Sequence, residues 1–379
     1  MKGEGVHCQR LGTKRNRKCR DDTLTSKKAG KLGFLTPLEF VLLLPIMSEL
    51  FIRQEILKNL PSLDCLLFDM DGVLLDVSQS FRAAIIETTQ FYIKEQLGLE
   101  DTGKLIEPEE IEMFKFAGGF NDDWDLTNAI VALLIGKWAQ SGAKDTQSLR
   151  EFGTDWREFT STIKRKGGGL QQAEGFILEM LKPSERREFA RAWNSKLVTR
   201  LFQEFYGGDE SCRDLYGFDP EYIHGQGYYR REQVLIKPSL IPSDIKTGLI
   251  TGRARAEAKL GLHHARLTNK IPENGWVVPD SGFKKPDGRT LLLAREKLDF
   301  KVGLYIGDIM DDLQTVFNYR ELKGSGKARI YSAIVLSGPG GATHRREFLE
   351  AGADIVAPDV NFLLEALGNI TKAAQSKRG

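Results

Sequence analysis

Six short apolar runs, most of them separated by helical stretches, limit the folds that this chain can adopt. The strand-like runs occupy residues 63–69, 247–251, 275–278, 302–308, 328–336 and 353–359. Helical patterning covers residues 253–262, 289–296, 310–320, 344–351 and 361–367. Strands that alternate with helices of this length form βαβ units. The sequence therefore predicts an α/β fold with a Rossmann-like, doubly wound parallel sheet.

Residues 79–233 interrupt this alternation with a mostly helical pattern. Helical stretches cover residues 80–96, 125–140 and 183–206, and four of the five tryptophans lie in this region. The simplest account is a mainly helical cap domain inserted after the first strand. The catalytic core would then comprise residues 47–78 and 234–379.

The N-terminal residues 1–46 differ in character from the rest. Residues 1–33 hold ten Lys or Arg against three Asp or Glu, a net charge of +7, whereas the whole chain carries +2. The remainder is therefore mildly acidic, which argues against a nucleic-acid partner. The apolar stretch at residues 34–47 contains Glu39 and is too short to span a bilayer, so no membrane partner is expected. We expect residues 1–46 to be disordered or outside the fold, and an amphipathic helix to begin at Met47.

Cysteine and histidine usage indicates the compartment. The four cysteines (Cys8, Cys19, Cys65 and Cys212) form no CxxC pair, and the five histidines are scattered. This pattern predicts a reducing, cytoplasmic location and no zinc site. The chain also lacks a P-loop and a GxGxxG motif, so ATP or NAD binding by those routes is not indicated.

Polar residues follow four of the predicted strands. They are Asp69, Asp71 and Gly72 after the first strand, Thr251 and Gly252 after the second, Lys284 and Lys285 after the third, and Asp308, Asp311 and Asp312 after the fourth. Ligands of open α/β sheets bind at the carboxyl ends of the strands. One edge of the sheet is therefore predicted to gather several carboxylates, a hydroxyl and an ammonium group.

Such a cluster of carboxylates needs a cation or protons. Two carboxylates about 4 Å apart repel by roughly 4 kcal/mol at an effective dielectric near 20. Oxygen ligands without His or Cys suit Mg²⁺, which usually bridges to a substrate phosphate. The lysine and the threonine hydroxyl would hold the other phosphate oxygens. Phosphoryl transfer needs mainly positioning and charge neutralisation, which this set of residues provides.

Four motifs carry a resemblance to a known family. "FDMDGVLLD", "LITGR", "KKPDG" and "YIGDIMDD", in this order, resemble the motifs of the haloacid-dehalogenase-like hydrolase superfamily over about residues 63–367. The insertion after the first strand resembles subclass I, whose members carry a helical cap. "MDGVLLDVSQSFRAAIIET" and "GGFNDDWDLT" resemble an uncharacterised phosphatase-like branch that is associated with imidazoleglycerol-phosphate dehydratase. This last similarity implies a functional association with histidine biosynthesis.

The resemblance implies roles for the strand-end residues. Asp69 matches the nucleophile that forms an aspartyl-phosphate, and Asp71 matches the general acid and base. Dehalogenating members generally lack this second aspartate, so Asp71 favours phosphate chemistry. The positions that hold the phosphate are Thr251, Gly252 and Lys285, with Lys284 as an alternative to Lys285. The metal positions are Asp69, Asp71 through its backbone carbonyl, Asp308 and, in the outer shell, Asp312, with Asp311 as its competitor.

Several of these residues also have a purely structural interpretation. Thr251 and Gly252 could cap a helix that starts at Arg253. Asp311 could serve only the dipole of the helix that it begins. In "GGFNDDWDLT", Asn121 could be an N-cap, or Asn121, Asp122 and Trp124 could form a substrate loop that faces the metal from the cap.

The sequence therefore predicts a Mg²⁺-dependent phosphatase that acts on a small phosphorylated metabolite through an aspartyl-phosphate. One alternative is a phosphomutase of the same fold, which would return the phosphoryl group to a substrate oxygen. Another is a catalytically silent protein that keeps the fold for binding or regulation.

Overall fold

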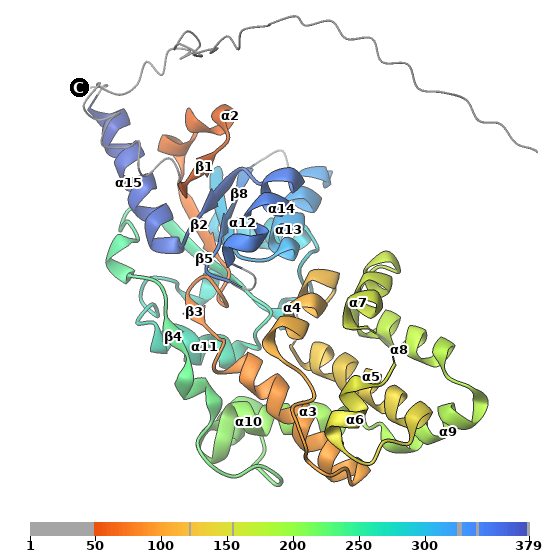
Figure 1. The fold of residues 1–379 in the computed structure, drawn as a ribbon. Coiled ribbons are helices and arrows are strands. Elements are labelled where there is room, and N and C mark those ends of the chain that lie inside the picture. The colour runs from red at the N-terminus through yellow and green to blue at the C-terminus, as the bar shows by residue number, and fades with distance from the viewer. Residues whose placement is uncertain (1–48, 121–122, 154, 324–327, 339–340, 377–379) are drawn as a thin grey trace, which may run out of the picture.

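The computed structural model describes residues 49–120, 123–153, 155–323, 328–338 and 341–376 (Figure 1). The predicted extension at residues 1–46 and the start at Met47 lie outside these residues. Where the structure describes the segment that follows, the prediction of one amphipathic helix is wrong. Strand β1 (Phe51–Ile52) pairs antiparallel with the last strand of the sheet, and the helix that follows it, α2, is limited to Gln54–Leu57. The edge of the sheet offers Phe51 and Ile52 a pairing that the local pattern does not reveal.

The central sheet contains seven strands in the order β1-β9-β8-β7-β2-β5-β6. Beside β1, its members are β2 (Cys65–Phe68), β5 (Lys246–Ile250), β6 (Trp276–Val277), β7 (Val302–Gly307), β8 (Arg329–Val335) and β9 (Ile355–Ala357). Every neighbouring pair is parallel except β1 and β9. All six predicted strands are present. Five are shorter than their apolar runs, and β5 has the predicted length but begins one residue earlier. The predicted doubly wound sheet is confirmed.

Helices cover both faces of this sheet. The core helices are α11 (Arg255–His264), α12 (Arg289–Leu298), α13 (Met310–Glu321), α14 (Arg345–Ala351) and α15 (Val360–Gln375). Leu66 and Phe68 of β2 pack into the apolar cluster that includes residues of α11 and α15. Cys65 and Leu67 pack into the opposite cluster, with residues of α12 and α13. This alternation follows from the two-residue period of a strand, which sends successive side chains to opposite faces.

The insertion between β3 and β4 is helical, as predicted (Figure 1). Its helices are α3 (Phe81–Leu97), α4 (Pro108–Ala117), α5 (Asp123–Ser141), α6 (Thr146–Glu151), α7 (Trp156–Arg165), α8 (Gly169–Met180), α9 (Pro183–Ala192) and α10 (Ser195–Tyr216). The single helical stretch predicted over residues 183–206 is wrong in one respect, because it contains two helices. The break falls at Asn194, whose side chain accepts a hydrogen bond from the N–H of Leu197 and begins α10.

Helix α5 forms the centre of the cap. Its side chains from Leu126 to Ile135 are all buried, and it packs against α3, α8, α9 and α10. A helix that is apolar on all sides is either enclosed by other helices or lies in a membrane. Here the surrounding helices account for the burial. Across the part of the chain that the structure describes, none of the helices combines the length and apolar character that a membrane crossing requires.

Two short linkers join the cap to the core. Strand β3 (Leu75–Asp76) leads out of the core and pairs antiparallel with β4 (Gln233–Val234), which leads back. The cap is therefore connected to the core by a two-stranded ribbon, which lies next to the carboxyl end of β2 (Figure 1). The domain limits 47–78, 79–233 and 234–379 remain a prediction, and this ribbon lies at both of the internal limits.

We predict that Leu134→Ala, in the buried face of α5, lowers the free energy of unfolding by about 2–5 kcal/mol, because a large-to-small change leaves a cavity in a packed core. Leu178→Ala is the matched control, since Leu178 on α8 is 39% exposed and its loss changes stability by about 0.5 kcal/mol at most. Urea unfolding followed by the fluorescence of the cap tryptophans measures both. Equal midpoints for the two variants would contradict the central position of α5.

Candidate active site

The candidate site lies where three parallel strands end. Asp69 follows β2, and its N–H donates to the carbonyl of Ile306 in β7 at 2.8 Å. Asp308 follows β7, and Thr251 follows β5. β2 is the central strand of these three, and the order of the sheet reverses there, because the chain runs from β2 to β5 and β6 on one side and then returns to β7 on the other. Such a switch point is where ligands bind in doubly wound sheets.

A tight turn after Asp69 shapes the site. The carbonyl of Met70 accepts hydrogen bonds from the N–H groups of Leu74 and Leu75 at 2.8 and 3.0 Å. Gly72 has φ +75°, and a Cβ there would lie 2.1 Å from Oδ2 of Asp308. Glycine is therefore required at this position for its conformation and for the space that the Asp308 carboxylate occupies.

Three buried carboxylates share this space. Asp69, Asp308 and Asp312 are each at most 4% exposed, and one oxygen of each lies within 4.8 Å of the others. The ammonium group of Lys285, also buried, lies 2.9 Å from Oδ2 of Asp69 and 2.7 Å from Oδ1 of Asp312. With all groups ionised, this cluster carries two uncompensated negative charges. It therefore requires bound protons or a cation.

Asp312 has donors on both oxygens. Its Oδ2 accepts the N–H groups of Asp308 and Ile309 at 3.0 and 3.1 Å, and its Oδ1 accepts the hydroxyl of Tyr305 at 2.7 Å as well as the Lys285 ammonium. Asp312 thus fixes the first turn of α13 and holds Lys285 against Asp69. This geometry favours Asp312 over Asp311 in the cluster.

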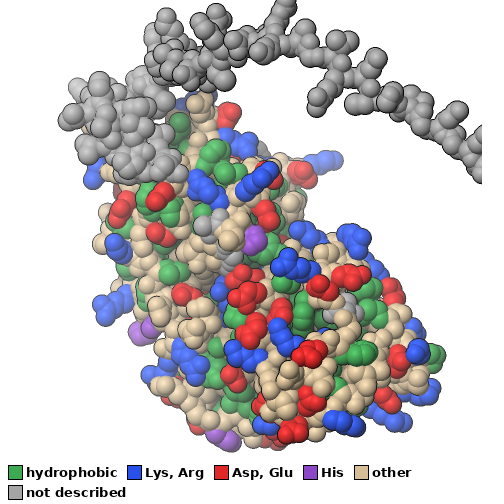
Figure 2. Space-filling model, in the orientation of Figure 1, with side chains coloured by type: hydrophobic (Ala, Val, Ile, Leu, Met, Phe, Trp, Pro, Cys, Tyr) green, Lys and Arg blue, Asp and Glu red, His purple; other side chains and the backbone are tan. Residues whose placement is uncertain are grey.

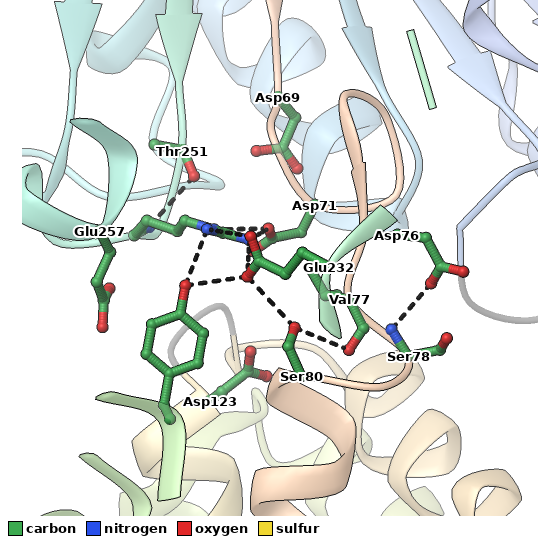
Figure 3. A network of polar contacts seen from close by, with 12 residues as sticks. Asp69, Asp71, Asp76, Val77, Ser78, Ser80, Asp123, Glu232, Thr251 and Glu257 are labelled. Carbon is green, nitrogen blue, oxygen red and sulfur yellow. Dashed lines mark hydrogen bonds and ion pairs between the residues drawn. The ribbon is translucent and has the colours of Figure 1, made fainter. Parts of the chain in front are cut away.

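The phosphate-binding candidates lie beside the cluster. Lys285 is buried, whereas Lys284 is exposed, so the geometry favours Lys285. Thr251 is 5% exposed, and its Oγ1 accepts the N–H of Arg253 at 3.2 Å (Figure 3). Helix α11 begins at Arg255, two residues later than predicted, so Thr251 is not its N-cap. The loop between Thr251 and α11 instead delivers the Arg253 side chain to Asp71.

Burial and charge shift the pKa values of this cluster. Desolvation raises the pKa of Asp69 to about 7; Lys285 opposes the shift, and repulsion from Asp312 and Asp71 adds to it. Desolvation also raises the pKa of Asp308, with further repulsion from Asp312 and Asp69. Burial alone would lower the pKa of Lys285, but Asp312 and Asp69 outweigh it and raise the pKa. Lys285 therefore stays charged, and burial and the excess negative charge of the cluster raise the pKa values of the carboxylates Asp69 and Asp308.

Mg²⁺, which the motifs imply, fits this donor set. The ligands are hard oxygens, the uncompensated charge is two, and no hydrogen-bond donor among the described residues contacts the Asp308 carboxylate. Asp69 and Asp308 are the carboxylates best placed to hold the ion, since Asp312 is occupied by its donors. The Asp71 carboxylate is not part of the group of three, so a metal role for Asp71 rests on its backbone carbonyl.

The cap contributes residues that the sequence analysis missed. A small cavity of about 40 Å³ is lined by Asp69, Asp71 and Asp308 from the core and by Arg82, Lys115, Phe120 and Asp123 from the cap. Lys115 lies 2.9 Å from Asp123 and is close enough to Asp308 to oppose the rise of its pKa. Figure 2 shows acidic and basic side chains together where the cap meets the core. The only sequence signal was that Lys115 and Asp123 flank Gly118 and Gly119.

A larger chamber of about 270 Å³ adjoins this cavity, because Asp71, Asp123 and Gly252 line both. Its other walls include Phe81 and Trp124 from the cap. Trp124 of the predicted substrate loop therefore faces the chamber, whereas Asn121 and Asp122 lie outside the described residues. The two spaces suit a phosphoryl group beside Asp69 and a leaving group beyond Asp71.

Comparisons with known proteins agree with this fold. No protein-family model matches the chain. Over 66 residues, it is 42% identical to imidazoleglycerol-phosphate dehydratase of Phytophthora nicotianae, a match that spans 17% of this chain and 12% of that protein. The structure is similar to phosphatase Tt82 from Thermococcus thioreducens, with a TM-score of 0.52 and 23% identity over 80% of this chain and 99% of the other. It is also similar to an X-ray structure from the Northeast Structural Genomics Consortium, with a TM-score of 0.54 and 15% identity over 82% of this chain and 100% of the other.

The strand order and the helical insertion agree with the fold that the resemblance of the four motifs predicted, the α/β fold of the haloacid-dehalogenase-like hydrolases.

We predict that the stability of the metal-free protein falls as the pH rises from 5 to 8. The pKa of Asp69 is raised from 3.8 to about 7 in the folded state, so folding is favoured while the proton is bound, and this contribution is lost as the pH rises through 7. Asp69→Asn removes the titrating group, and its Tm falls less over the same range. Added Mg²⁺ raises the Tm of the wild type more at pH 8 than at pH 5, because the ion binds the ionised carboxylates.

Asp244→Asn is the control for this experiment, since Asp244 is exposed and lies outside the cluster. Its Tm follows that of the wild type at every pH. If the Tm of Asp69→Asn depends on pH and Mg²⁺ as steeply as that of the wild type, the assignment of the cluster is wrong.

Proposed function

We propose that this protein is a Mg²⁺-dependent phosphatase that hydrolyses a small phosphorylated metabolite through an aspartyl-phosphate on Asp69. The observation that supports this best is the separation of two aspartates at the end of β2. Asp69 lies in the buried cluster against Lys285, whereas Asp71 lies outside it, 26% exposed at its side chain and paired with Arg253. This difference in surroundings supports covalent catalysis by Asp69 and proton transfer by Asp71.

In the first step, a carboxylate oxygen of Asp69 attacks the phosphorus, and the bond between phosphorus and the leaving oxygen breaks. Asp71 donates its proton to that oxygen, so the leaving group departs as an alcohol. Lys285 and Thr251 hold the phosphoryl oxygens. A bound Mg²⁺, held by Asp69, Asp308 and the Asp71 carbonyl, would neutralise charge on the phosphoryl group.

In the second step, water attacks the phosphorus of the aspartyl-phosphate. Asp71, now a carboxylate, accepts a proton from this water, and the bond between phosphorus and the Asp69 oxygen breaks. Inorganic phosphate leaves, and both aspartates return to their starting states. Asp71 therefore acts as an acid and then as a base within one cycle.

The dimensions of the site favour a small substrate. The cavity beside Asp69 has room for little more than a phosphoryl group, and the adjoining chamber of about 270 Å³ would receive the rest of the molecule. Lys115 of the cap would add a positive charge near the phosphoryl group. The local similarity to an imidazoleglycerol-phosphate dehydratase is a reason to include imidazole-containing phosphates, such as histidinol phosphate, in a substrate screen.

We predict that the purified full-length chain hydrolyses p-nitrophenyl phosphate when Mg²⁺ is present and that EDTA abolishes the activity. Asp69→Asn lowers kcat/KM by at least about 10³-fold, because it removes the nucleophile. Asp244→Asn serves as the control and keeps wild-type activity. Release of inorganic phosphate and mass spectrometry of the phosphorylated protein measure turnover and the intermediate.

Four results would bear against this proposal. Activity that does not depend on Mg²⁺ contradicts the metal, and an Asp69→Asn variant as active as the wild type contradicts the nucleophile. No hydrolysis of any phosphate ester by a folded wild type that binds Mg²⁺ indicates a binding protein. A metabolite that is isomerised with little free phosphate indicates a phosphomutase instead.

A further inference from the structure

Arg253 is a buried arginine that the reaction as described so far does not use. Its side chain is only 1% exposed, and two of its nitrogens contact the Asp71 carboxylate. Nε donates to Oδ1 of Asp71 at 2.8 Å, and Nη2 lies 2.7 Å from the same oxygen. The guanidinium group is planar and carries fixed donors, so these contacts constrain the direction of the carboxylate as well as its distance.

Glu232 holds the other side of the guanidinium group. Its Oε1 lies 2.8 Å from Nη2 of Arg253, and its Oε2 lies 3.3 Å from Nη1. The hydroxyl of Tyr206 accepts from Nη1 at 3.1 Å and donates to Oε1 of Glu232 at 2.9 Å. When Asp71 is protonated, Arg253 and Glu232 remain as a neutral pair, so no uncompensated cation is left buried.

The surrounding side chains leave Arg253 little freedom. The ring of Phe81 lies 4.7 Å from the guanidinium carbon and stacks on Tyr206 with the ring centroids 4.3 Å apart. On the side of α11, a Cβ at Gly261 would lie 3.0 Å from Nη1. A cation that is packed between an aromatic ring and a glycine keeps one rotamer.

The residues that hold Arg253 come from the two linkers and the cap (Figure 3). Glu232 directly precedes β4, and Ser80, which precedes α3, donates to Oε1 of Glu232 at 3.3 Å. Tyr206 lies in α10. The position of Arg253 therefore depends on segments that join the cap to the core, although Arg253 itself belongs to the core.

We propose that Arg253 is a positioning residue for Asp71, held in place by Glu232 and Tyr206. Arg253 engages one oxygen of Asp71 and leaves the other for the proton that passes to the leaving group. Because Glu232 and Tyr206 belong to a linker and to the cap, the position of these segments determines where Arg253 holds the Asp71 carboxylate. This inference rests on the proposed phosphatase activity, and it assigns to Arg253 an effect on proton donation alone.

The test compares two kinds of leaving group. p-Nitrophenolate leaves without a proton, whereas the alkoxide of glycerol 2-phosphate or another alkyl phosphate needs one. We expect Arg253→Gln to lower kcat/KM for the alkyl phosphate about 100-fold and for p-nitrophenyl phosphate at most about threefold. kcat/KM reports the formation of the aspartyl-phosphate, so the later role of Asp71 as a base does not affect the comparison.

Glu232→Gln keeps the size of the side chain and removes its charge. We expect this variant to lower kcat/KM for the alkyl phosphate about tenfold more than for p-nitrophenyl phosphate. The Tm of Arg253→Gln shows whether that variant folds. If it does not fold, Glu232→Gln tests the positioning role of Arg253 in its place. Arg346→Gln breaks an exposed ion pair with Glu350 on α14 and changes neither substrate, which controls for loss of an arginine. Asp71→Asn sets the full size of the effect.

The outcomes distinguish a failure of the role given to Arg253 from a failure of the proposed phosphatase activity. If Asp71→Asn discriminates between the leaving groups but Arg253→Gln and Glu232→Gln lower both substrates by the same factor, Arg253 has only a structural role and the inference is overturned. If the wild type hydrolyses neither substrate, the proposed function fails, and the inference fails with it. A change confined to the alkyl phosphate in both variants supports it.

Discussion

Three buried carboxylates lie beside one buried ammonium group: Asp69 and Asp308 follow β2 and β7, and Asp312 lies in the first turn of α13. Bringing these charges together away from water costs free energy, and the surrounding groups offset part of that cost. Two carboxylates about 4 Å apart repel by roughly 4 kcal/mol even at an effective dielectric of 20. Lys285, from the loop after β6, offsets part of this, and backbone N–H groups at the start of α13 stabilise Asp312. The glycines at positions 72 and 338 leave room for Asp308, since a Cβ at either position would lie within about 2 Å of its Oδ2.

The core of this arrangement could be predicted from the sequence because its signals are local. A buried parallel strand is a short apolar run, and the residues that follow such runs meet at one edge of the sheet. That rule alone places Asp69, Thr251, Lys285 and Asp308 at one edge of the sheet. Their burial, and the donors that favour Asp312 over Asp311, depend on distances that no local pattern contains.

The contacts of the cap and the linkers could not be predicted, because they join residues that are far apart in the chain. Asp71 and Arg253 are 182 positions apart, and Ser80 and Glu232 are 152 apart. Arg253 appeared in the sequence only as the residue after Thr251 and Gly252, and Glu232 had no pattern at all. The same limit explains β1, since a two-residue strand exists only through its pairing with β9. Helical periodicity likewise showed that residues 183–206 are helical without showing that Asn194 divides them.

The separation of Asp69 from Asp71 has a physical reason that the spacing of the motif does not suggest. Two side chains that are two positions apart on a strand point to the same face and could share one cation. Here β2 ends at Phe68, and the chain turns, so Asp69 meets Lys285 while Asp71 meets Arg253. In the proposed reaction, Asp69 must stay ionised to attack, whereas Asp71 gains and loses a proton in each cycle. With a single shared cation, each change at Asp71 would alter the electrostatic environment of the nucleophile. Separate partners, one balanced by Asp312 and the other by Glu232, limit this effect to the direct repulsion between Asp71 and Asp69.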